Sequence, residues 1–419
     1  MNRKVISVFE HSVIRVGDEF NSKDDKKIIF EAKHFQALEK FRGSKDFHYY
    51  NLIYNGIKLT EYVGVIQVGS LVIEVLPKID KYESDSNIWR DLLIGMLKSV
   101  GAFNVKAPSS SSLSLKSNYI LDLYFELFIK EVEYLAHQGL VKKYRKTEGN
   151  SLSLIGNIKF GKHIQQNLVH QERFYIEQTV YDKDHLLHQI IFQAILLLKK
   201  INTNPILSSR ISNLLINLPE VKNIKISEST FEKINLYRKT QDYKQAIEIA
   251  KLLLLNYHPD LSNGQNNILA LMFDMNLLWE QFVYVALKRK LDSYNVSAQV
   301  SKGFWQSKGN YCVGMKPDIV IENSTKEKFV LDTKWKNITG TKPSSDDLRQ
   351  MYVYNEYFDA KKTALAYPGV VHNNFSGFYE KNSRNETRDM ECSVITISKK
   401  PSISEWQDEI FRNINEWIN

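Results

Sequence analysis

Cysteine is almost absent from this 419-residue sequence, which has only Cys312 and Cys392. Two cysteines so far apart cannot form a disulfide scaffold, and they supply too few thiolates for a zinc ribbon or an iron–sulfur cluster. The composition therefore excludes small disulfide-rich secreted domains and cysteine-based metal centres.

Long apolar runs are also missing. The longest apolar stretch, around Ile190–Leu198, is interrupted by Gln193 and followed by two lysines, so it is too short to span a bilayer. The first twenty residues contain no continuous apolar segment of the kind found in secretory signals. We therefore expect a cytoplasmic protein with no membrane association.

The overall composition is that of an ordinary globular protein, with 43% hydrophobic and 25% charged residues. A chain of this length normally forms two or three domains, and no period of about 20 to 50 residues repeats as in a solenoid. The net charge is 56 − 48 = +8. This mild basic excess permits a polyanionic partner and gives weak support for nucleic acid.

A complete nucleotide-binding loop is missing as well. The stretch "GNIKFGKH" (Gly156–His163) resembles the start of such a loop, but His163 stands where a magnesium-binding hydroxyl is needed. Its Ile158 and Phe160 alternate as in a strand. We therefore expect that this chain does not itself bind or hydrolyse a nucleoside triphosphate.

The first half of the chain shows a change from strands to helices. Residues 1 to about 80 have strand character, and "YVGVIQVGSLVIEVLPKI" carries Gly64 and Gly69 as expected turns. A helix is expected near Asn87–Val100. Apolar spacing predicts a further helix that ends at Gly139, and the chain from 183 to 257 is predicted to be mostly helical.

The last third has the order of elements of an α/β core. "NILALMFDMNLLWEQFVYVALKRKLDSY" is predicted to be one long helix, followed by at least three strands, the helix "SSDDLRQMYVYNEYF" and the strand "KTALAYP". The predicted fold is a multidomain α/β protein. Its expected parts are a β-rich amino-terminal domain (1–106), a linker (107–117), a mostly helical middle region (118–265) and a carboxyl-terminal core (266–419).

The stretch "KPDIVIENSTKEKFVLDTKWK" (Lys316–Lys336) places charged residues at the ends of two short apolar strands. If the strands form a hairpin, Asp318 at the start of the first becomes a neighbour of Asp332 at the end of the second. Lys334 shares a face with Asp332, because side chains two apart in a strand point the same way. The hairpin therefore predicts two carboxylates and an ammonium group at one end of a sheet.

Such a cluster suits Mg²⁺-assisted hydrolysis of a phosphodiester. Magnesium prefers oxygen ligands and activates a bound water molecule, and a lysine can offset the charge that develops on the phosphorus oxygens. The alternative is an ordinary solvated hairpin, because this pattern also arises by chance. A second Pro-Asp pair, Pro259-Asp260, has no matching strand after it.

Three further residues join the hypothesis. Glu280 lies in "LLWEQFV" on the preceding helix, and its position taken alone favours an ordinary glutamate on the helix surface. Gln350 and Tyr354 are four residues apart and so share one helix face, although core packing alone would explain the tyrosine.

Together these motifs resemble the PD-(D/E)xK nuclease superfamily and, more closely, the McrC family. The resemblance rests on "FDMNLLWEQFV", "MKPDIVI", "LDTKWK" and "DLRQMYVY". It implies a PD-(D/E)xK restriction-endonuclease-like core at the carboxyl end. Lys316 departs from the pattern, because an arginine is common before the Pro-Asp pair.

The resemblance also implies roles for the residues. Asp318 and Asp332 would bind Mg²⁺ (Mn²⁺ is an expected substitute), with the backbone carbonyl of Thr333 and Glu280 as further ligands. Lys334 would orient the attacking water, and Gln350 and Tyr354 would support the site or the DNA backbone.

The implied function is that of an endonuclease subunit in antiviral restriction. It would cut double-stranded DNA containing modified cytosine, and residues 1–106 would dock on a hexameric AAA+ GTPase of the McrB type, which binds the GTP. A non-catalytic adaptor of such a motor and a stand-alone DNA-end nuclease remain as alternatives.

Overall fold

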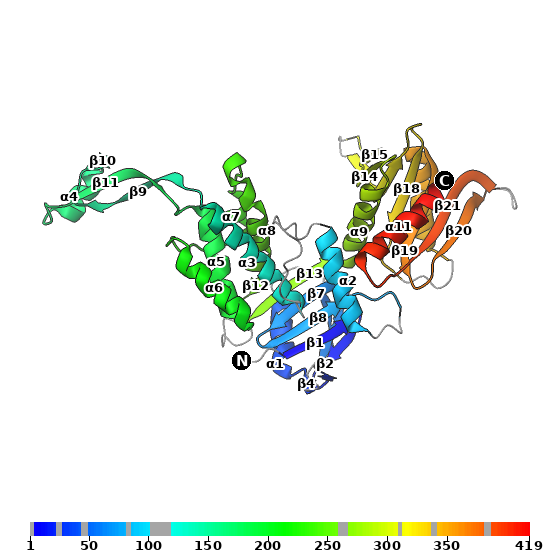
Figure 1. Ribbon diagram of the computed structural model, residues 1–419, viewed down its shortest axis with the longest axis horizontal. Helices are drawn as coiled ribbons and strands as arrows, with labels where there is room; N and C mark the ends of the chain where they lie inside the picture. Colours follow the sequence, from blue (N-terminus) through cyan, green and yellow to red (C-terminus); the bar gives the residue numbers. More distant parts are fainter. Residues whose placement is uncertain are drawn as a thin grey trace. The chain divides into compact units, whose positions relative to one another are not determined.

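The computed structural model describes residues 4–21, 27–42, 49–80, 85–100, 119–258, 267–308, 312–336, 342–380 and 387–419. Two compact units make up the chain (Figure 1). One comprises Met1–Arg3 and Val105–Pro259, and the other comprises Lys4–Asn104 and Asp260–Asn419. The second unit thus contains both the amino-terminal and the carboxyl-terminal segments that the sequence suggested as separate domains. The expected linker at 107–117 lies outside the described residues.

The amino-terminal part of the second unit is built on a sheet of mixed direction. Strand β1 (Lys4–Phe9) runs parallel to β8 (Leu71–Leu76), and β8 pairs antiparallel with β7 (Tyr62–Val68) through a turn at Gly69. Strand β13 (Ile268–Asp274) pairs antiparallel with β7. A strand from the distant second half of the chain therefore joins this sheet.

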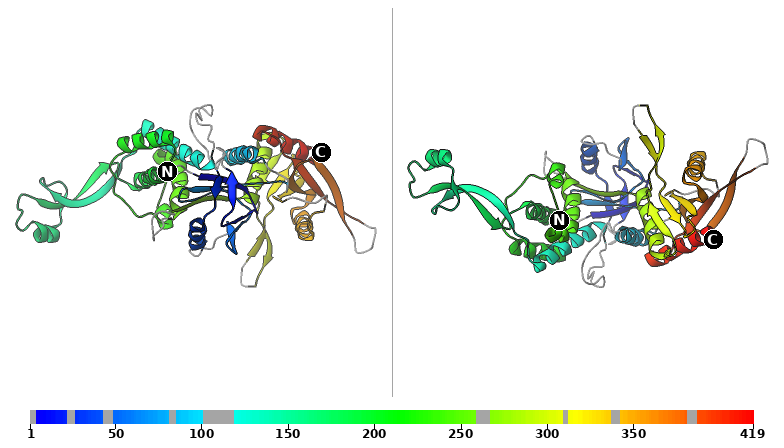
Figure 2. Two further views of the ribbon diagram at one scale, coloured as in Figure 1. Left: turned by 90° about the horizontal axis from the view of Figure 1, so that it is seen from below. Right: turned by 90° about the horizontal axis from the view of Figure 1, so that it is seen from above.

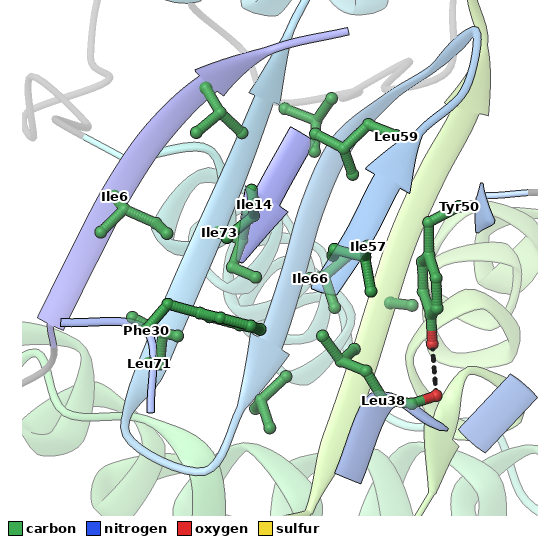
Figure 3. Close-up of a cluster of buried hydrophobic side chains, with 14 of the residues drawn as sticks. Ile6, Ile14, Phe30, Leu38, Tyr50, Ile57, Leu59, Ile66, Leu71 and Ile73 are labelled. Carbon is green, nitrogen blue, oxygen red and sulfur yellow. Dashed lines mark hydrogen bonds between the residues drawn. The ribbon is translucent and has the colours of Figure 1, made fainter. Parts of the chain in front are cut away.

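Shorter elements pack against the sheet and close its core, which Figure 3 shows. They are β2 (Val13–Arg15), β3 (Glu19–Asn21), β4 (Lys27–Ile29), α1 (Ala32–Arg42), β5 (Tyr50–Ile53) and β6 (Gly56–Leu59). Phe30, Ile57 and Ile66 are fully buried there, and the Tyr50 hydroxyl donates a hydrogen bond to the Leu38 carbonyl at 2.7 Å. The helix α1 was not expected, because this region was predicted as strands throughout.

Two predictions for this sheet were wrong. Ile268–Asp274 is a strand and not the start of a long helix; the helix α9 (Met275–Lys290) begins only after Asp274, whose side chain caps it. Gly64 lies inside β7 and not in a turn. Its φ is +137°, and an added Cβ would come within 2.2 Å of the Leu271 carbonyl oxygen, so glycine is needed for the close approach of β13.

The carboxyl-terminal part of the second unit is built on a six-stranded sheet. In spatial order its strands are β14 (Asn295–Ala298), β17 (Ile319–Glu322), β18 (Lys328–Thr333), β19 (Ala360–Gly369), β21 (Thr387–Ser398) and β20 (Asn373–Glu380). Strands β18, β19 and β21 are parallel neighbours. The helix α10 (Ser345–Phe358) connects β18 to β19, as a parallel pair requires. The predicted strand–helix–strand order of this region is confirmed.

Helices cover both faces of this sheet. On one face, Val330 of β18 packs in a core with Met351 and Tyr354 of α10. On the other face, the neighbouring Phe329 packs against Trp417 of α11 (Ile403–Ile418), with ring centroids 5.9 Å apart. Because side chains alternate along a strand, Asp332 and Lys334 follow Val330 onto the α10 face.

Four tryptophans join the two parts of this unit. Trp89 of α2 (Ser86–Ser99) makes edge contacts with Trp335 and Trp406, and Trp279 of α9 contacts the same two rings. The helix α2 confirms the helix expected near 87–100. Trp335 comes directly after the candidate Lys334, so the end of β18 is held by an aromatic core.

The other unit is mostly helical, as predicted. Its helices are α3 (Ile120–Gln138), α5 (Leu186–Ile201), α6 (Pro205–Asn217), α7 (Glu228–Glu232), the 3₁₀ helix η1 (Arg238–Tyr243) and α8 (Lys244–Leu255), with a short strand β12 (Tyr257–His258) at the end. Gly139 caps α3 with φ +91°, which confirms the predicted helix end. A long hairpin of β9 (Lys143–Ser151) and β11 (Phe174–Asp182) extends from this bundle (Figures 1 and 2).

The far end of that hairpin carries β10 (Asn157–Ile158) and α4 (Phe160–Asn167). Phe160 therefore begins a helix. The alternation of Ile158 and Phe160 had suggested that it continues a strand, and that prediction was wrong. Several apolar side chains at this end are exposed by more than half, which is typical of a surface that another protein covers. They are Leu152, Leu154, Ile155, Phe160, Ile164, Leu168 and Val169.

The expectation of an α/β fold is thus confirmed. Within the part of the chain described above, no helix is both long enough and apolar enough to cross a membrane.

Candidate active site

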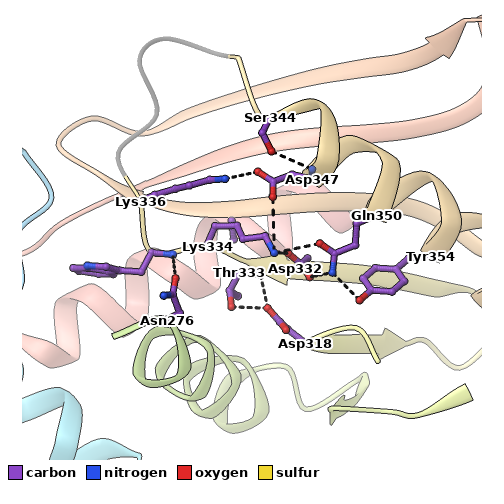
Figure 4. Close-up of polar contacts among 12 residues, drawn as sticks. Asn276, Asp318, Asp332, Thr333, Lys334, Lys336, Ser344, Asp347, Gln350 and Tyr354 are labelled. Atoms are coloured by element: carbon purple, nitrogen blue, oxygen red, sulfur yellow. Dashed lines mark hydrogen bonds and ion pairs between the residues drawn. The ribbon is translucent and has the colours of Figure 1, made fainter. Parts of the chain in front are cut away.

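Asp318 and Asp332 are neighbours at one end of the six-stranded sheet. Strands β17 and β18 pair antiparallel with Ile319 opposite Leu331, so the next step of the register brings the two aspartates together (Figure 4). The predicted hairpin and its register are confirmed. The turn between the strands, at residues 323–327, is only a few residues long, which fixes this register locally.

The Asp318 carboxylate is held by the end of β18. Its Oδ2 accepts hydrogen bonds from the backbone N–H of Thr333 at 2.7 Å and from the Thr333 hydroxyl at 2.8 Å. These two bonds fix the direction of a half-buried carboxylate. They also bring Thr333, whose carbonyl was predicted as a ligand, into direct contact with Asp318.

The Asp332 side chain is only 1% exposed, and its ionisation is correspondingly costly. Burial and the nearby Asp318 carboxylate raise the pKa of Asp332 to about 7, against the opposing charge of Lys334. The Lys334 ammonium lies 2.8 Å from Asp332 Oδ2. This ion pair compensates the buried carboxylate in part.

Lys334 stays a cation in this environment. Burial alone would lower the pKa of Lys334, but the carboxylates of Asp332, Asp347 and Asp318 outweigh it and the pKa is raised. The ammonium also donates a hydrogen bond to Gln350 Oε1 at 3.3 Å.

The predicted pair on α10 reaches the site. Gln350 Nε2 donates to Asp332 Oδ1 at 3.4 Å and to the Tyr354 hydroxyl at 2.8 Å, and that hydroxyl donates to the Lys316 carbonyl at 3.3 Å. Tyr354 is also part of the core between α10 and the sheet. Core packing is therefore confirmed for this tyrosine, and its predicted support of the site stays a prediction that these hydrogen bonds favour.

Asp347 was missed by the sequence analysis. It lies in the first turn of α10, where its carboxylate is 4.0 Å from the Lys334 ammonium and pairs with Lys336. Burial acts against ionisation of Asp347, but Lys336, Ser344 and Lys334 together lower its pKa. Its position three residues before Gln350 puts it on the same helix face, which is the signal that could have identified it.

Glu280 lies on α9 and is 9% exposed. Its carboxylate accepts a hydrogen bond from the Gln299 side chain, and burial together with the Asp318 charge raises its pKa. Across the described ranges, no three His, Cys, Asp or Glu side chains form a group able to hold a metal ion. A role for Glu280 as a ligand therefore stays a prediction.

The donor set nevertheless suits magnesium. Mg²⁺ typically takes one or two carboxylates and keeps several water molecules, so Asp318, Asp332 and the Thr333 carbonyl would be sufficient. The observation that favours a bound cation here is the meeting of two carboxylates at the end of the hairpin: the Asp318 charge disfavours ionisation of Asp332, and a bound divalent cation would offset this.

A second set of contacts fixes the strand end. The backbone N–H of Lys334 donates to the Ala366 carbonyl at 3.0 Å, and the Trp279 indole N–H donates to the same oxygen at 3.3 Å. The next residue, Trp335, donates its indole N–H to buried Glu10 at 2.8 Å. The site thus rests on the tryptophan cluster and on the amino-terminal sheet.

Comparison with known proteins identifies a family that this chain matches. The sequence model of a family described as McrBC 5-methylcytosine restriction system component matches residues 57–368. One relative, the type IV methyl-directed restriction enzyme EcoKMcrBC of Escherichia coli (strain K12), is 23% identical over 274 residues, which are 62% of this chain and 75% of that protein.

A solved structure shows the same fold over the whole chain. It is the refined half-complex from a tetradecameric assembly of Thermococcus gammatolerans McrB AAA+ hexamers with bound McrC. The match covers 99% of this chain and 100% of that chain, with 19% identity and a TM-score of 0.68. The molecule is a restriction-system component. The chain belongs to the family of McrBC 5-methylcytosine restriction system components, and the resemblance to McrC that the motifs suggested is supported.

Proposed function

We propose that this chain is the nuclease subunit of a modification-dependent restriction system and that it hydrolyses phosphodiester bonds in DNA. The observation that carries the proposal is the meeting of Asp318, Asp332 and Lys334 at the end of the β17–β18 hairpin. Family membership supports the restriction context. Within this proposal, the β17–β18–α10 region is the PD-(D/E)xK core expected from the sequence.

Each residue has a chemical task in this proposal. Asp318, Asp332 and the Thr333 carbonyl would hold Mg²⁺, with Mn²⁺ as a substitute, and Glu280 would be an accessory ligand. The bound ion would polarise the phosphate and lower the pKa of the attacking water. Lys334 would stabilise negative charge on the phosphate oxygens, and Gln350 and Tyr354 would hold Lys334 and Asp332 in place.

The proposed partner is an AAA+ GTPase of the McrB type. The related Thermococcus gammatolerans structure contains McrB AAA+ hexamers with bound McrC, and the Escherichia coli relative is described as methyl-directed. We infer the same division of labour here, with the partner binding GTP and moving along DNA that contains modified cytosine. Docking through residues 1–106 stays a prediction.

The test is plasmid cleavage in Mg²⁺ by this chain together with the AAA+ protein encoded beside it. Methylated and unmethylated plasmids are compared, with GTP or ATP. We expect cleavage of methylated DNA that is lost in Asp332→Asn, a nearly isosteric change. The control is Asp346→Asn, because Asp346 lies in the first turn of the neighbouring helix and its side chain is 85% exposed.

Three outcomes would contradict the proposal. Full cleavage by Asp332→Asn would remove the assigned site. Stimulated nucleotide hydrolysis by the partner, with no cleavage by either the wild type or the variant, would favour the adaptor. Cleavage of DNA ends by the chain alone, without partner or nucleotide, would favour the stand-alone nuclease.

A further inference from the structure

A two-stranded ribbon leaves the carboxyl-terminal part of the second unit beside the candidate site. Its strands are β15 (Lys302–Gln306) and β16 (Cys312–Met315), which pair antiparallel and form a sheet of their own. Both views of Figure 2 show it as a yellow-green arm that stands clear of the six-stranded sheet. An isolated ribbon of this kind has little hydrophobic core to stabilise it. Its exposed side chains are therefore better explained by a binding role than by packing.

The residues that flank the two strands of this arm make hydrogen bonds to residues of the candidate site. On one side, Gln299 donates its backbone N–H to the Asp318 carbonyl at 2.9 Å and its side chain to Glu280. On the other side, the Lys316 carbonyl accepts the Tyr354 hydroxyl at 3.3 Å. Any duplex bound with a phosphate at Asp318 must therefore pass next to the arm.

The chemistry of the arm suits a polyanion whose groove also offers apolar contacts, such as thymine methyl groups. Residues 293–317 contain three lysines, Lys302, Lys308 and Lys316, and no acidic residue. Trp305 is 55% exposed and pairs across the ribbon with Val313, which is 40% exposed. Phe304, in contrast, packs on Tyr357 of α10 with ring centroids 5.0 Å apart, so it anchors the arm while Trp305 stays available.

We propose that the β15–β16 arm is a binding element for double-stranded DNA, with Lys308 on a phosphate and Trp305 in the groove. This inference rests on the proposed nuclease function, because the site supplies the substrate. Five residues of strand extend about 17 Å, which exceeds the width of the major groove, about 12 Å, and two-stranded ribbons fit that groove. The absence of acidic residues makes DNA a better occupant than a basic protein surface.

The test measures the affinity of the full chain for a fluorescent 30-base-pair duplex in EDTA at several salt concentrations, so that no cleavage is needed. The double variant Trp305→Ala/Lys308→Ala is expected to weaken binding about 10-fold and to reduce the slope of log affinity against log salt by about 1. The matched control is Tyr54→Ala/Lys58→Ala. It removes an exposed aromatic and an exposed lysine from the β5–β6 hairpin, and its affinity should stay within about twofold of wild type.

A single charge reversal, Lys308→Glu, gives a second reading and should weaken binding at low salt more than at high salt. Unchanged affinity in both arm variants, or equal losses in the arm and control variants, would overturn the inference. So would normal DNA affinity combined with loss of binding to the AAA+ partner, because the arm would then be a protein contact. Since binding is measured without cleavage, this experiment is independent of the Asp332→Asn test. The arm proposal can therefore be wrong while the proposed nuclease function still holds.

Discussion

The Lys334 ammonium lies 2.8 Å from Asp332 Oδ2, on the face of the sheet that α10 covers. A buried carboxylate and a half-buried ammonium compensate each other only when further polar groups complete their hydrogen bonds. Here α10 supplies those groups, through Gln350 and Asp347. The helix therefore does more than pack on the sheet, because it also sets the position of the charge proposed to act on phosphate.

Asp347→Asn should lower cleavage through Lys334 without removing a proposed metal ligand. The change keeps the shape of the side chain but removes the negative charge 4.0 Å from the Lys334 ammonium and the ion pair with Lys336. We expect kcat to fall about 10-fold or more, since small displacements of a catalytic group are costly, while KM for DNA changes little. The measurement is the rate of plasmid cleavage over a range of DNA concentrations.

Asp346→Asn is the control for this change, because Asp346 is one residue away and pairs only with exposed Arg349 among the described residues. A melting temperature that matches wild type would show that Asp347→Asn has not disturbed the fold. Equal kcat values for Asp347→Asn and wild type would show that Lys334 is held without Asp347.

The sequence predicted the local part of the site and missed the distant part. Asp318, Asp332 and Lys334 lie on one hairpin, whose short turn fixes their register. Gln350 and Tyr354 follow from helix periodicity. The bond between Trp335 and Glu10, in contrast, joins residues 325 positions apart, and no local pattern in the sequence points to it.

The wrong prediction for Ile268–Asp274 has a similar cause. A short continuous apolar run is compatible with a buried strand or a buried helix, and the helix that follows made the second choice natural. Only pairing with β7, some two hundred residues earlier, makes this segment a strand. The partner of Glu280, Gln299, was missed for the same reason, because it lies on a different element.

Glu10 should make stability depend on pH. Burial raises its pKa from 4.5 to about 7, against hydrogen bonds from Trp335 and Lys78. Between these two values the folded protein keeps the proton and the unfolded chain loses it. The contribution of Glu10 to the free energy of unfolding is therefore fully present below pH 4.5 and is lost as pH rises through about 7. The total loss is about 3 kcal/mol.

Glu10→Gln removes this titration and keeps an oxygen that can accept both hydrogen bonds. Thermal melts at pH 5 and pH 8 should show that wild type loses stability relative to Glu10→Gln as pH rises. Exposed Glu39→Gln is the control and should follow wild type. A constant difference between wild type and Glu10→Gln across this range would mean that Glu10 is ionised throughout.

Gly64→Ala should destabilise the sheet that connects the amino-terminal segment to the candidate nuclease core. At this position the backbone has φ +137°, and the new Cβ would lie 2.2 Å from the Leu271 carbonyl oxygen. Alanine must therefore adopt a strained conformation and push β13 away from β7, which we expect to cost at least about 2 kcal/mol. Urea unfolding measures the change.

The matched control is Gly149→Ala in the β9–β11 hairpin, where nothing lies within 4 Å of an added Cβ, and its stability should stay within about 0.5 kcal/mol of wild type. Because β13 leads directly into α9, and Asn276 on α9 accepts a hydrogen bond from the backbone of Trp335 at 3.3 Å, the strain should also reach the end of β18. Cleavage by Gly64→Ala should therefore fall at temperatures where the variant is still folded. Wild-type cleavage in a folded but destabilised Gly64→Ala protein would show that the site is independent of this sheet.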